Sequence, residues 1–442
     1  MGFKYAEALA RRHEVVVLSS PPSQTPTGAT LLPCNAGPCS FNEVGAMPLL
    51  RFELRQLSLA RRLRRRFQYD FVHRVTPSAI QLPTWAARLG RPFVIGPLIA
   101  AERPPAVFAP LLARPVSAPS QARWHPARAV GRLCRMAVQR AGENQAHLRE
   151  AKRLLVGTRT ALRHVPEGLR EKCRLVTYSG VEHEVFKPES GEGRKENGGG
   201  GAGTTGLRDY GTTDRSLRLL FVGRLVPYKG VELLLRAVAV ASKKCALSLD
   251  IVGGGDPVYK DYLVRLCGEL GLAVTDHGTT GLPDYETTRR RDDGLRSSVR
   301  FWAPVAREEL PALYQQADVF CFPTLCDTYG IALLEAMSCG CAVLVSDVAG
   351  AGEIVNSENG IKVPLRNPDQ YIQASADAIV ALAMNTELRA RLGSNARQFI
   401  VAEHDWDRIG EQILSIYSEL EHDFLRLSGS PVVPFSNRPV VP

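Results

Sequence analysis

Short apolar runs alternate with longer amphipathic stretches along most of the 442-residue chain. In the second half the apolar runs are Leu217–Val222, Leu247–Val252, Val299–Val305, Asp318–Pro323 and Ala342–Ser346. In the first half they are Val15–Leu18, Phe71–Val75, Pro92–Ile95, Arg153–Val156 and Arg174–Thr177. Strand-like runs separated by helix-like stretches are typical of an α/β protein with parallel sheets. A chain of this length usually exceeds one hydrophobic core, so the pattern predicts two domains.

A polar stretch from Glu189 to Asp214 interrupts this pattern. It is rich in Gly, Ser, Thr and charged residues, and such a composition cannot bury enough apolar surface to order itself. We therefore expect the first domain at residues 1–186 and a flexible linker at 187–214. A second polar insertion, Thr275–Ser298, is expected to form a surface loop.

The first candidate for chemistry lies where the run Leu217–Val222 ends. Gly223 allows a sharp turn, Arg224 and Lys229 flank that turn, and an apolar helix-like run begins at Val231. A planar guanidinium and a compact ammonium both suit phosphate oxygens. Open α/β sheets bind ligands at the carboxyl ends of their strands. The segment is therefore a candidate phosphate site, and a solvated basic turn is the alternative.

The second candidate follows the run Asp318–Pro323, where a loop leads into a predicted helix. The backbone N–H groups of Gly330, Ile331 and Ala332 would begin that helix without intrahelical acceptors, which favours a phosphate at this end. Glu335 lies one turn further along. A buried carboxylate needs partners, and sugar or ribose hydroxyls would supply them. A helix cap or a surface charge is the alternative for this glutamate.

Together the two segments resemble glycosyltransferase family 4, the retaining nucleotide-sugar transferases of GT-B fold. The resemblance is clear from about residue 215 to 425 and looser before that. It implies an α/β fold of two Rossmann-like domains, with parallel sheets that face each other across a cleft. The second domain would occupy residues 215–404. A last helix at 405–427 would cross back to the first domain, followed by a loose tail at 428–442.

The resemblance also implies roles for the candidate residues. In the family, the Gly-Arg-x4-Lys-Gly turn holds the donor diphosphate, which gives that role to Gly223, Arg224 and Lys229. Two family carboxylates separated by seven residues fall on Asp327 and Glu335. Glu335 would hold the nucleotide ribose, and Asp327 the hydroxyls of the transferred sugar. The family has Glu at the first position, and Asp retracts the carboxylate oxygens by roughly one C–C bond.

Further family landmarks follow in order. The backbone near Val305 contacts the base in relatives. Gly253 to Gly255 resemble the glycine turn near the nucleotide, although as a dinucleotide fingerprint the triplet is weak. Gly350 and Gly352, after the run at 342–346, resemble the last turn that faces the donor.

The first residues raise a separate expectation. Relatives begin with a central strand and a Gly-rich loop, whereas this sequence begins inside the helix that follows them, with Gly2 as a remnant. Loss of a central strand would open the core, and net stabilities are only about 5–15 kcal/mol. We therefore expect either a fragment or a rearranged first domain, with the first strand missing.

A candidate histidine lies in the first domain. Asp70–Pro77 resembles the strand end that carries a histidine near the reacting centre in the family, which implies a catalytic role for His73. A core histidine with both ring nitrogens hydrogen-bonded is the alternative.

The formal net charge of +10 is concentrated in the first half. Residues 1–170 contain 26 Lys and Arg against 9 Asp and Glu, and the remainder is net acidic. The clusters Arg61–Arg66 and Arg128–Arg140 favour either a solvated helix face or adhesion to anionic lipid headgroups, to which each basic residue contributes on the order of 1 kcal/mol. Nucleic-acid binding is not expected because few aromatic residues lie among these charges.

Other features exclude further classes of protein. The ten cysteines form no Cys-x-x-Cys pair, and the sequence contains no run of about eighteen apolar residues. We expect a cytoplasmic protein with reduced thiols, either dissolved or peripheral at a membrane. Asp405 and Asp407 mimic the Asp-x-Asp of metal-dependent transferases but precede a helix, so we expect a cap, no essential metal and no other cofactor.

The resemblance implies that the chain transfers a sugar, with retention at the anomeric carbon, from a nucleotide-diphosphate sugar to a hydroxyl of a glycan or lipid-linked acceptor. Two functions of other classes stay open. One is a noncatalytic descendant that binds a nucleotide sugar, favoured by the residue at 327 and the altered first domain. The other is a scaffold that adheres to membranes through its basic half.

Overall fold

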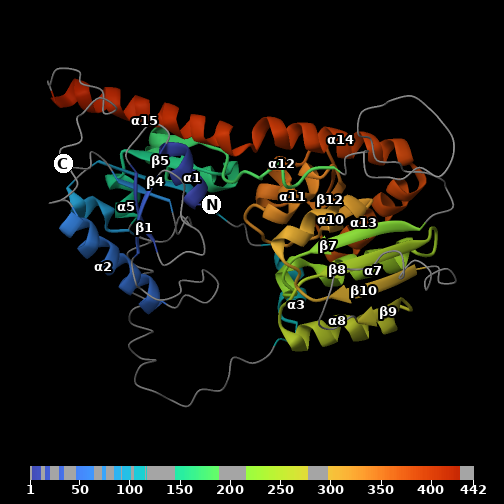
Figure 1. Cartoon of the computed structure of the whole chain (residues 1–442). Helices are drawn as coiled ribbons and strands as arrows, with labels where there is room; N and C mark the ends of the chain where they lie inside the picture. The colour runs from blue at the N-terminus through green and yellow to red at the C-terminus, as the bar shows by residue number, and fades with distance from the viewer. Residues whose placement is uncertain are drawn as a thin grey trace, which may run out of the picture. The chain divides into compact units, whose positions relative to one another are not determined.

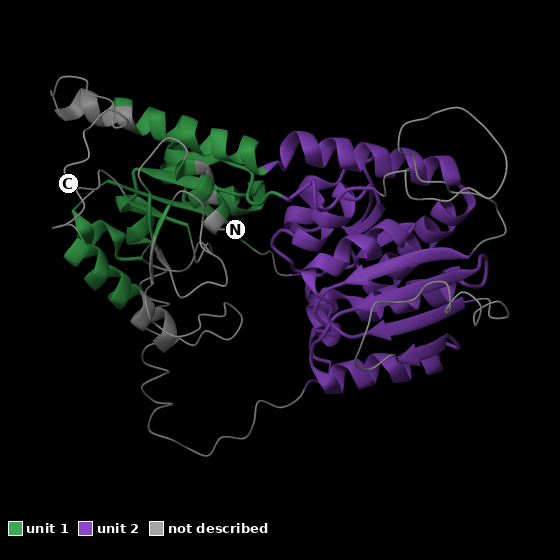
Figure 2. Ribbon diagram, in the orientation of Figure 1, with its two compact units in different colours: residues 1–100, 120–180, 406–442 green, residues 101–119, 181–405 purple. Residues whose placement is uncertain are grey.

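The computed structural model describes residues 2–10, 15–19, 29–33, 46–63, 72–75, 84–90, 92–100, 104–114, 116, 145–188, 216–276 and 297–428. The chain forms two compact units, which Figure 2 colours separately. Unit 1 comprises Met1–Ala100, Ser120–Gly180 and Trp406–Pro442, and unit 2 comprises Ala101–Pro119 and Val181–Asp405. The predicted linker beyond residue 188, the basic run 128–140, most of the insertion 275–298 and the tail beyond residue 428 lie outside the described residues.

Unit 2 is built on one sheet of seven strands, in the order β13-β12-β11-β7-β8-β10-β9 (Figure 1). The strands are β7 (Leu217–Val222), β8 (Leu247–Val252), β9 (Ala273–Asp276), β10 (Ser297–Trp302), β11 (Val319–Phe322), β12 (Ala342–Ser346) and β13 (Ile361–Val363). Every neighbouring pair runs parallel. The predicted parallel α/β architecture is confirmed in this unit.

Helices cover both faces of this sheet, which is why its strands are apolar on both sides. On β11, Val319 and Cys321 belong to the core shared with α7, α8 and α13. Phe320 points to the opposite face, where its ring packs edge-on against Tyr314 of α10 at 5.6 Å between centroids. The α-helices in the described part of unit 2 are α3 (Ala109–Leu112), α7 (Val231–Ala241), α8 (Pro257–Glu269), α10 (Leu310–Gln316), α11 (Ile331–Ser338), α12 (Ala349–Ile354), α13 (Pro368–Met384) and α14 (Thr386–Glu403).

The strand order contains a topological switch point between β7 and β11. The chain winds outward from β7 through β8 and β10, then returns to β11 on the other side of β7 and continues to β12 and β13. In open α/β sheets the crevice beyond the carboxyl ends of the strands at such a point is where ligands bind. Both segments singled out in the sequence follow these two strands.

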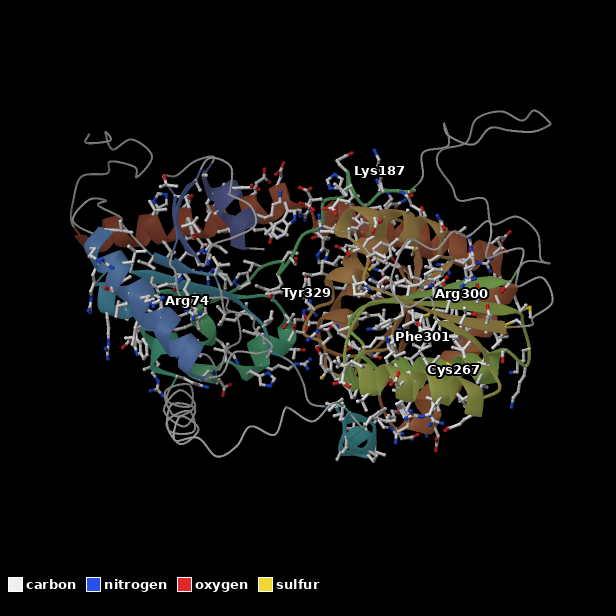
Figure 3. The ribbon with its side chains drawn as sticks, turned by 60° about the horizontal axis from the view of Figure 1, so that its bottom comes forward. Arg74, Lys187, Cys267, Arg300, Phe301 and Tyr329 are labelled. Atoms are coloured by element: carbon white, nitrogen blue, oxygen red, sulfur yellow. The ribbon has the colours of Figure 1, made fainter. Side chains whose placement is uncertain are left out.

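A buried charge network lies on the β8–β10 pair. Arg300 and Asp250 are direct cross-strand partners, and the Arg300 Nε and Nη2 atoms donate to the two Asp250 oxygens at 2.8 Å each. The Trp302 indole N–H donates to the same carboxylate at 2.7 Å. All three residues are buried (Figure 3 labels Arg300). The network satisfies a carboxylate that the sheet would otherwise bury without partners.

Among its described residues, unit 1 contains two parallel sheets, one with the order β1-β2 and the other with the order β3-β4-β5-β6. Its strands are β1 (Val16–Ser19), β2 (Thr30–Pro33), β3 (Val72–Arg74), β4 (Phe93–Leu98), β5 (Arg153–Val156) and β6 (Cys173–Leu175), and its α-helices are α1 (Gly2–Ala10), α2 (Ala46–Leu63), α5 (Ala146–Glu150), α6 (Arg159–His164) and α15 (Trp406–Ser428). The parallel strands expected from the first half of the sequence are therefore present. No strand was predicted at β2.

The last helix, α15, belongs to unit 1. Ile409, Ile413 and Tyr417 on this helix pack against Val94 of β4 and Leu155 of β5. After Asp405 the chain therefore leaves unit 2, and α15 packs on the sheet of unit 1. The last helix that the family resemblance implied at 405–427 corresponds to α15.

Residues 101–119 belong to unit 2, although the boundaries drawn from the sequence placed them in the first domain. Phe108 is fully buried in the unit 2 core. The Arg114 guanidinium donates to both oxygens of Glu232 on α7 at 2.7 Å each. A bidentate pair with a buried carboxylate fixes geometry as well as energy, and this pair fastens the segment to unit 2.

Candidate donor-binding site

The basic turn after β7 is shaped by the neighbouring turn after β8. The Gly223 N–H donates to the Val252 carbonyl oxygen at 3.0 Å, and the Leu225 N–H donates to the Gly254 carbonyl oxygen at 2.8 Å. Gly253 has a φ of +143°, and a Cβ there would lie 2.1 Å from the Gly223 carbonyl oxygen. Only glycine permits this approach of the two backbones.

The same turn is joined to the loop after β11. The Leu325 N–H donates to the Tyr228 carbonyl oxygen at 2.8 Å, and the Thr324 hydroxyl donates to the same oxygen at 3.3 Å. Gly230 has a φ of +70°, and a Cβ there would lie 1.9 Å from the Pro323 carbonyl oxygen. Two segments about a hundred residues apart therefore form one surface at the switch point.

Replacing Gly230 by alanine should separate these two segments. We expect loss of nucleotide binding and a larger loss of stability than for Gly271→Ala, because a Cβ at Gly230 overlaps the Pro323 backbone. Gly271 has the same φ of +70° with nothing within 4 Å of its Cβ, so it isolates the cost of the left-handed backbone, about 1–2 kcal/mol. Urea unfolding and nucleotide titration of both variants check this; equal effects in the two variants would contradict it.

Lys229 and Asp327 form an ion pair across this surface. Both side chains are largely buried, with 14% and 21% of their area exposed. The Lys229 Nζ atom lies 5.4 Å from the centre of the Phe322 ring and 5.7 Å from that of Tyr228. The ammonium is thus held in place by a carboxylate and two aromatic faces.

Arg224 is fixed by the same aromatic ring. Its Nη2 atom donates to the Tyr228 hydroxyl, and its Cζ atom lies 5.8 Å from the ring centre. Tyr228 therefore contacts both predicted phosphate-binding cations, Arg224 and Lys229. The sequence pattern identified the two cations but not the tyrosine between them.

Helix α11 begins beside this cluster. Gly330 precedes it with a φ of +96°, and a Cβ there would lie 2.9 Å from the Phe322 ring. The first helical residues, Ile331 and Ala332, present N–H groups that have no intrahelical acceptor; Ile331 is 50% exposed. This end of the helix carries a partial positive charge and suits an anion.

Glu335 lies on the same helix and is buried. The Tyr314 hydroxyl donates to its Oε2 atom at 3.1 Å, and the Arg307 Nε atom lies 3.9 Å from its Oε1 atom. Burial raises the pKa of Glu335 to about 7, against the opposing effects of the Tyr314 hydrogen bond and the Arg307 charge. A carboxylate has about four acceptor positions, so hydroxyl donors can be added to the hydrogen bond from Tyr314.

Val305 lies half-buried in the loop that follows β10. This loop leads to a short 3₁₀ helix, η5 (Arg307–Glu309), which carries Arg307 toward Glu335. Val305 and Glu335 therefore belong to neighbouring segments linked through that arginine. Neither Arg307 nor Tyr314 was singled out in the sequence, because each acts through a side chain that is distant along the chain.

His73 lies on β3 in unit 1 and is fully engaged there. Its Nε2 atom lies 2.8 Å from the Gly96 carbonyl oxygen, and its Nδ1 atom is bonded to the Tyr417 hydroxyl of α15. Since a carbonyl only accepts, Nε2 carries the proton and Nδ1 accepts from Tyr417. Burial lowers the pKa of His73 to about 4, so it is neutral at pH 7. This is the arrangement of a satisfied core histidine, and a catalytic role for it stays a prediction.

The described part of the chain contains no group of three or more His, Cys, Asp or Glu side chains that could hold a metal ion. Asp405, part of the sequence that mimics Asp-x-Asp, lies before α15 and pairs with His183 at 3.1 Å. Among the described helices, none is long and apolar enough to cross a membrane.

Comparison with known proteins relates part of this chain to a protein family. The family model "Glycosyl transferases group 1" matches residues 208–399. An uncharacterized glycosyltransferase of Methanocaldococcus jannaschii is 33% identical over 211 residues, which are 48% of this chain and 47% of that protein. A D-inositol 3-phosphate glycosyltransferase of Salinispora arenicola is 28% identical over 282 residues, 63% of this chain and 57% of that protein. The chain thus spans about half the length of the curated relatives it matches.

Solved structures show the same fold. Sucrose-phosphate synthase from Thermosynechococcus elongatus aligns with a TM-score of 0.61 at 20% identity, over 95% of this chain and 92% of that one. The Anabaena protein HepE in complex with UDP aligns with a TM-score of 0.57 at 15% identity, over 94% of both chains. The predicted GT-B fold is therefore confirmed, and residues 208–399 are similar in sequence to the group 1 glycosyl transferases.

Proposed function

We propose that the chain is a glycosyltransferase that moves a sugar from a nucleotide-diphosphate sugar to a hydroxyl acceptor, with retention at the anomeric carbon. The observation that carries this proposal is the joining of Lys229 and Asp327 at the switch point of unit 2. There Arg224 and the first turn of α11 add positive charge from the neighbouring segments. A solved neighbour, HepE, binds UDP and UDP-glucose, which supports a nucleotide-sugar donor and makes UDP-glucose the first probe.

The chemistry follows from where charge develops. The bond from the anomeric carbon to the diphosphate oxygen breaks as the acceptor oxygen attacks from the same face, and the hydroxyl proton passes to the departing diphosphate. Lys229, Arg224 and the N–H groups of α11 stabilise the growing negative charge, which is usually the largest catalytic effect. Lys229 exchanges Asp327 for a phosphate oxygen on binding, and Asp327 then accepts from sugar hydroxyls.

Glu335 completes the donor site in this proposal by accepting hydrogen bonds from the ribose hydroxyls, and the backbone at Val305 borders the base. The test is calorimetric titration with a panel of nucleotide sugars, followed by assays of hydrolysis and of transfer to simple glycosides. Binding with turnover supports the transferase. Binding without turnover supports the noncatalytic descendant, and no binding by any member of the panel would overturn both.

A second observation favours an anionic membrane surface as a partner, with a lipid-linked acceptor. On α2, Leu54 is 50% exposed, and Arg55, Arg61 and Arg62 are exposed with it. An exposed apolar side chain among basic ones suits an anionic lipid surface. We expect the chain to sediment with vesicles containing phosphatidylglycerol and not with neutral vesicles, and Arg61→Gln/Arg62→Gln to weaken this. Equal sedimentation of the variant would contradict the assignment to α2.

A further inference from the structure

Arg307 is shared between two carboxylates. Its Nε atom lies 3.9 Å from the Glu335 Oε1 atom, and its Nη2 atom forms an ion pair with the Glu182 Oε2 atom. Glu182 belongs to the segment that enters unit 2 after Gly180. Arg307 therefore lies between the buried Glu335 and a carboxylate that the function proposed above does not use.

Aromatic side chains hold the guanidinium in this position. The Arg307 Cζ atom lies 5.0 Å from the centre of the Phe186 ring. Phe186 is fully buried and packs against Tyr314 at 6.2 Å between centroids. Because Tyr314 also donates to Glu335, a closed ring of contacts joins four side chains, which are Arg307, Phe186, Tyr314 and Glu335. The Glu182 carbonyl oxygen accepts from the Val185 and Phe186 N–H groups at 2.9 Å, which fixes the turn that carries Glu182.

The charges that act on Glu335 come from three elements. Tyr314 of α10 donates a hydrogen bond, Arg307 of η5 supplies positive charge, and Glu182 of the entering segment supplies negative charge. Helix α14 also packs against α11, and the Nη1 atom of its Arg397 donates to the Ser338 carbonyl oxygen at 2.6 Å. Arg307 and Glu182, whose charges shift the pKa of Glu335 in opposite directions, are thus paired with each other.

We propose that Arg307 is a positioning residue for donor binding, because its guanidinium keeps the Glu335 carboxylate charged. Glu182 limits this effect because it competes for the same guanidinium. This inference rests on the proposed function, since it takes the hydroxyls of a donor nucleotide as the ligand of Glu335. The pair would set the pH range over which a nucleotide sugar binds. Arg307 would act through Glu335, even where the nucleotide itself does not touch its side chain.

The sign of the effect follows from the charges. A carboxylate accepts hydroxyl hydrogen bonds better than a carboxylic acid, which keeps one oxygen as a donor. Burial raises the pKa of Glu335 to about 7, so donor affinity should rise as the pH increases through about 7. The pH at which affinity is halfway through this rise is the midpoint. Loss of the Arg307 charge should raise the midpoint, and loss of the Glu182 charge should lower it. General damage to the fold would not move the midpoint in opposite directions.

The experiment measures UDP-glucose affinity by calorimetry between pH 5.5 and 8.5. Another member of the nucleotide-sugar panel replaces UDP-glucose if it binds more tightly. A sugar diphosphate diester keeps its charge over this range, whereas the terminal phosphate of UDP titrates near pH 6. The variants are Arg307→Gln and Glu182→Gln. Glu308→Gln is the matched control because Glu308 is an exposed neighbour on the same 3₁₀ helix, and Glu335→Gln removes the titrating group.

We expect the midpoint of Arg307→Gln to lie roughly half a pH unit to one unit above that of the parent chain, and that of Glu182→Gln to lie below it. At a pH well below the midpoint, a shift of one pH unit corresponds to about a tenfold lower affinity of Arg307→Gln than of the parent chain. Glu308→Gln should match the parent, and Glu335→Gln should show no midpoint.

Two results would overturn the inference while leaving the proposed function intact. One is binding by the parent with midpoints unchanged in both variants, and the other is an affinity loss of the same factor at every pH. Absence of binding by any nucleotide sugar would instead overturn both the inference and the proposed function. Thermal unfolding of each variant identifies one that fails to fold, and Arg307→Lys, which keeps the charge, should restore the parent midpoint.

Discussion

Replacing Lys229 by alanine should lower turnover of a nucleotide sugar by a factor of about 100 or more with the fold intact. Lys229 is 14% exposed, so its ammonium acts in a partly desolvated site where charge interactions are stronger than in water. The change also leaves Asp327 without its cation and adds negative charge where the diphosphate would lie. Steady-state kinetics with the nucleotide sugar that binds best measures the effect, and circular dichroism reports the fold.

Lys244→Ala is the matched control for this variant. Lys244 follows α7 in the same unit, and its pair with Asp377 is long, at 3.7 Å, with both side chains 58% exposed. Exposed pairs of this kind contribute little to stability, so turnover should stay within about twofold of the parent. A folded Lys229→Ala chain with nearly normal turnover would refute the assignment of the basic turn to catalysis.

Replacing Asp250 by alanine should destabilise unit 2 by about 3–5 kcal/mol. The change removes the acceptor of two Arg300 hydrogen bonds and of the Trp302 indole bond. A guanidinium that is 5% exposed would then stay buried without its counter-charge. Among single substitutions, such a loss belongs to the largest class.

Urea unfolding followed by circular dichroism measures this loss. Asp276→Asn serves as the control, because its pair with Lys260 lies at the surface, with side chains 41% and 26% exposed. That control should cost less than about 1 kcal/mol. Equal stabilities of the two variants would show that the network on β8 and β10 contributes no more than a surface pair.

The sheet of unit 2 could be predicted because its strands carry strong local signals. Leu217–Val222, Leu247–Val252 and Ala342–Ser346 are apolar runs of strand length, and they form β7, β8 and β12 with the same bounds. Gly223 and Gly253, which follow the first two runs, mark turns where two backbones approach closely, and Gly330 at the start of α11 lies against the Phe322 ring. Local propensity, turn residues and buried position agree at these places.

Other features could not be predicted because they depend on contacts between distant residues. No local signal assigns residues 101–119 to unit 2, since the Arg114–Glu232 pair joins positions 118 residues apart. The short strands β2 and β13 lack the long apolar runs that mark central strands. The family resemblance implied a catalytic role for His73. Only its contacts with Gly96 and Tyr417 reveal that both ring nitrogens are hydrogen-bonded.

Within the candidate site, the sequence identified the charged groups but not the residues that orient them. Arg224, Lys229, Asp327 and Glu335 were predicted from spacing and family resemblance, and the structure brings Lys229 and Asp327 into direct contact. The contacts of Tyr228 and Arg307 could not be predicted from the sequence, because a tyrosine in a turn and an arginine on an exposed 3₁₀ helix are common surface features. Their roles depend on which side chains the fold brings beside them.

A crystal structure of the chain soaked with UDP tests the central claim most directly. The account predicts phosphate oxygens within hydrogen-bond distance of Lys229 and of the N–H groups at Gly330–Ala332, with the Lys229–Asp327 pair opened. Diphosphate density at another surface, with that ion pair unchanged, would contradict it.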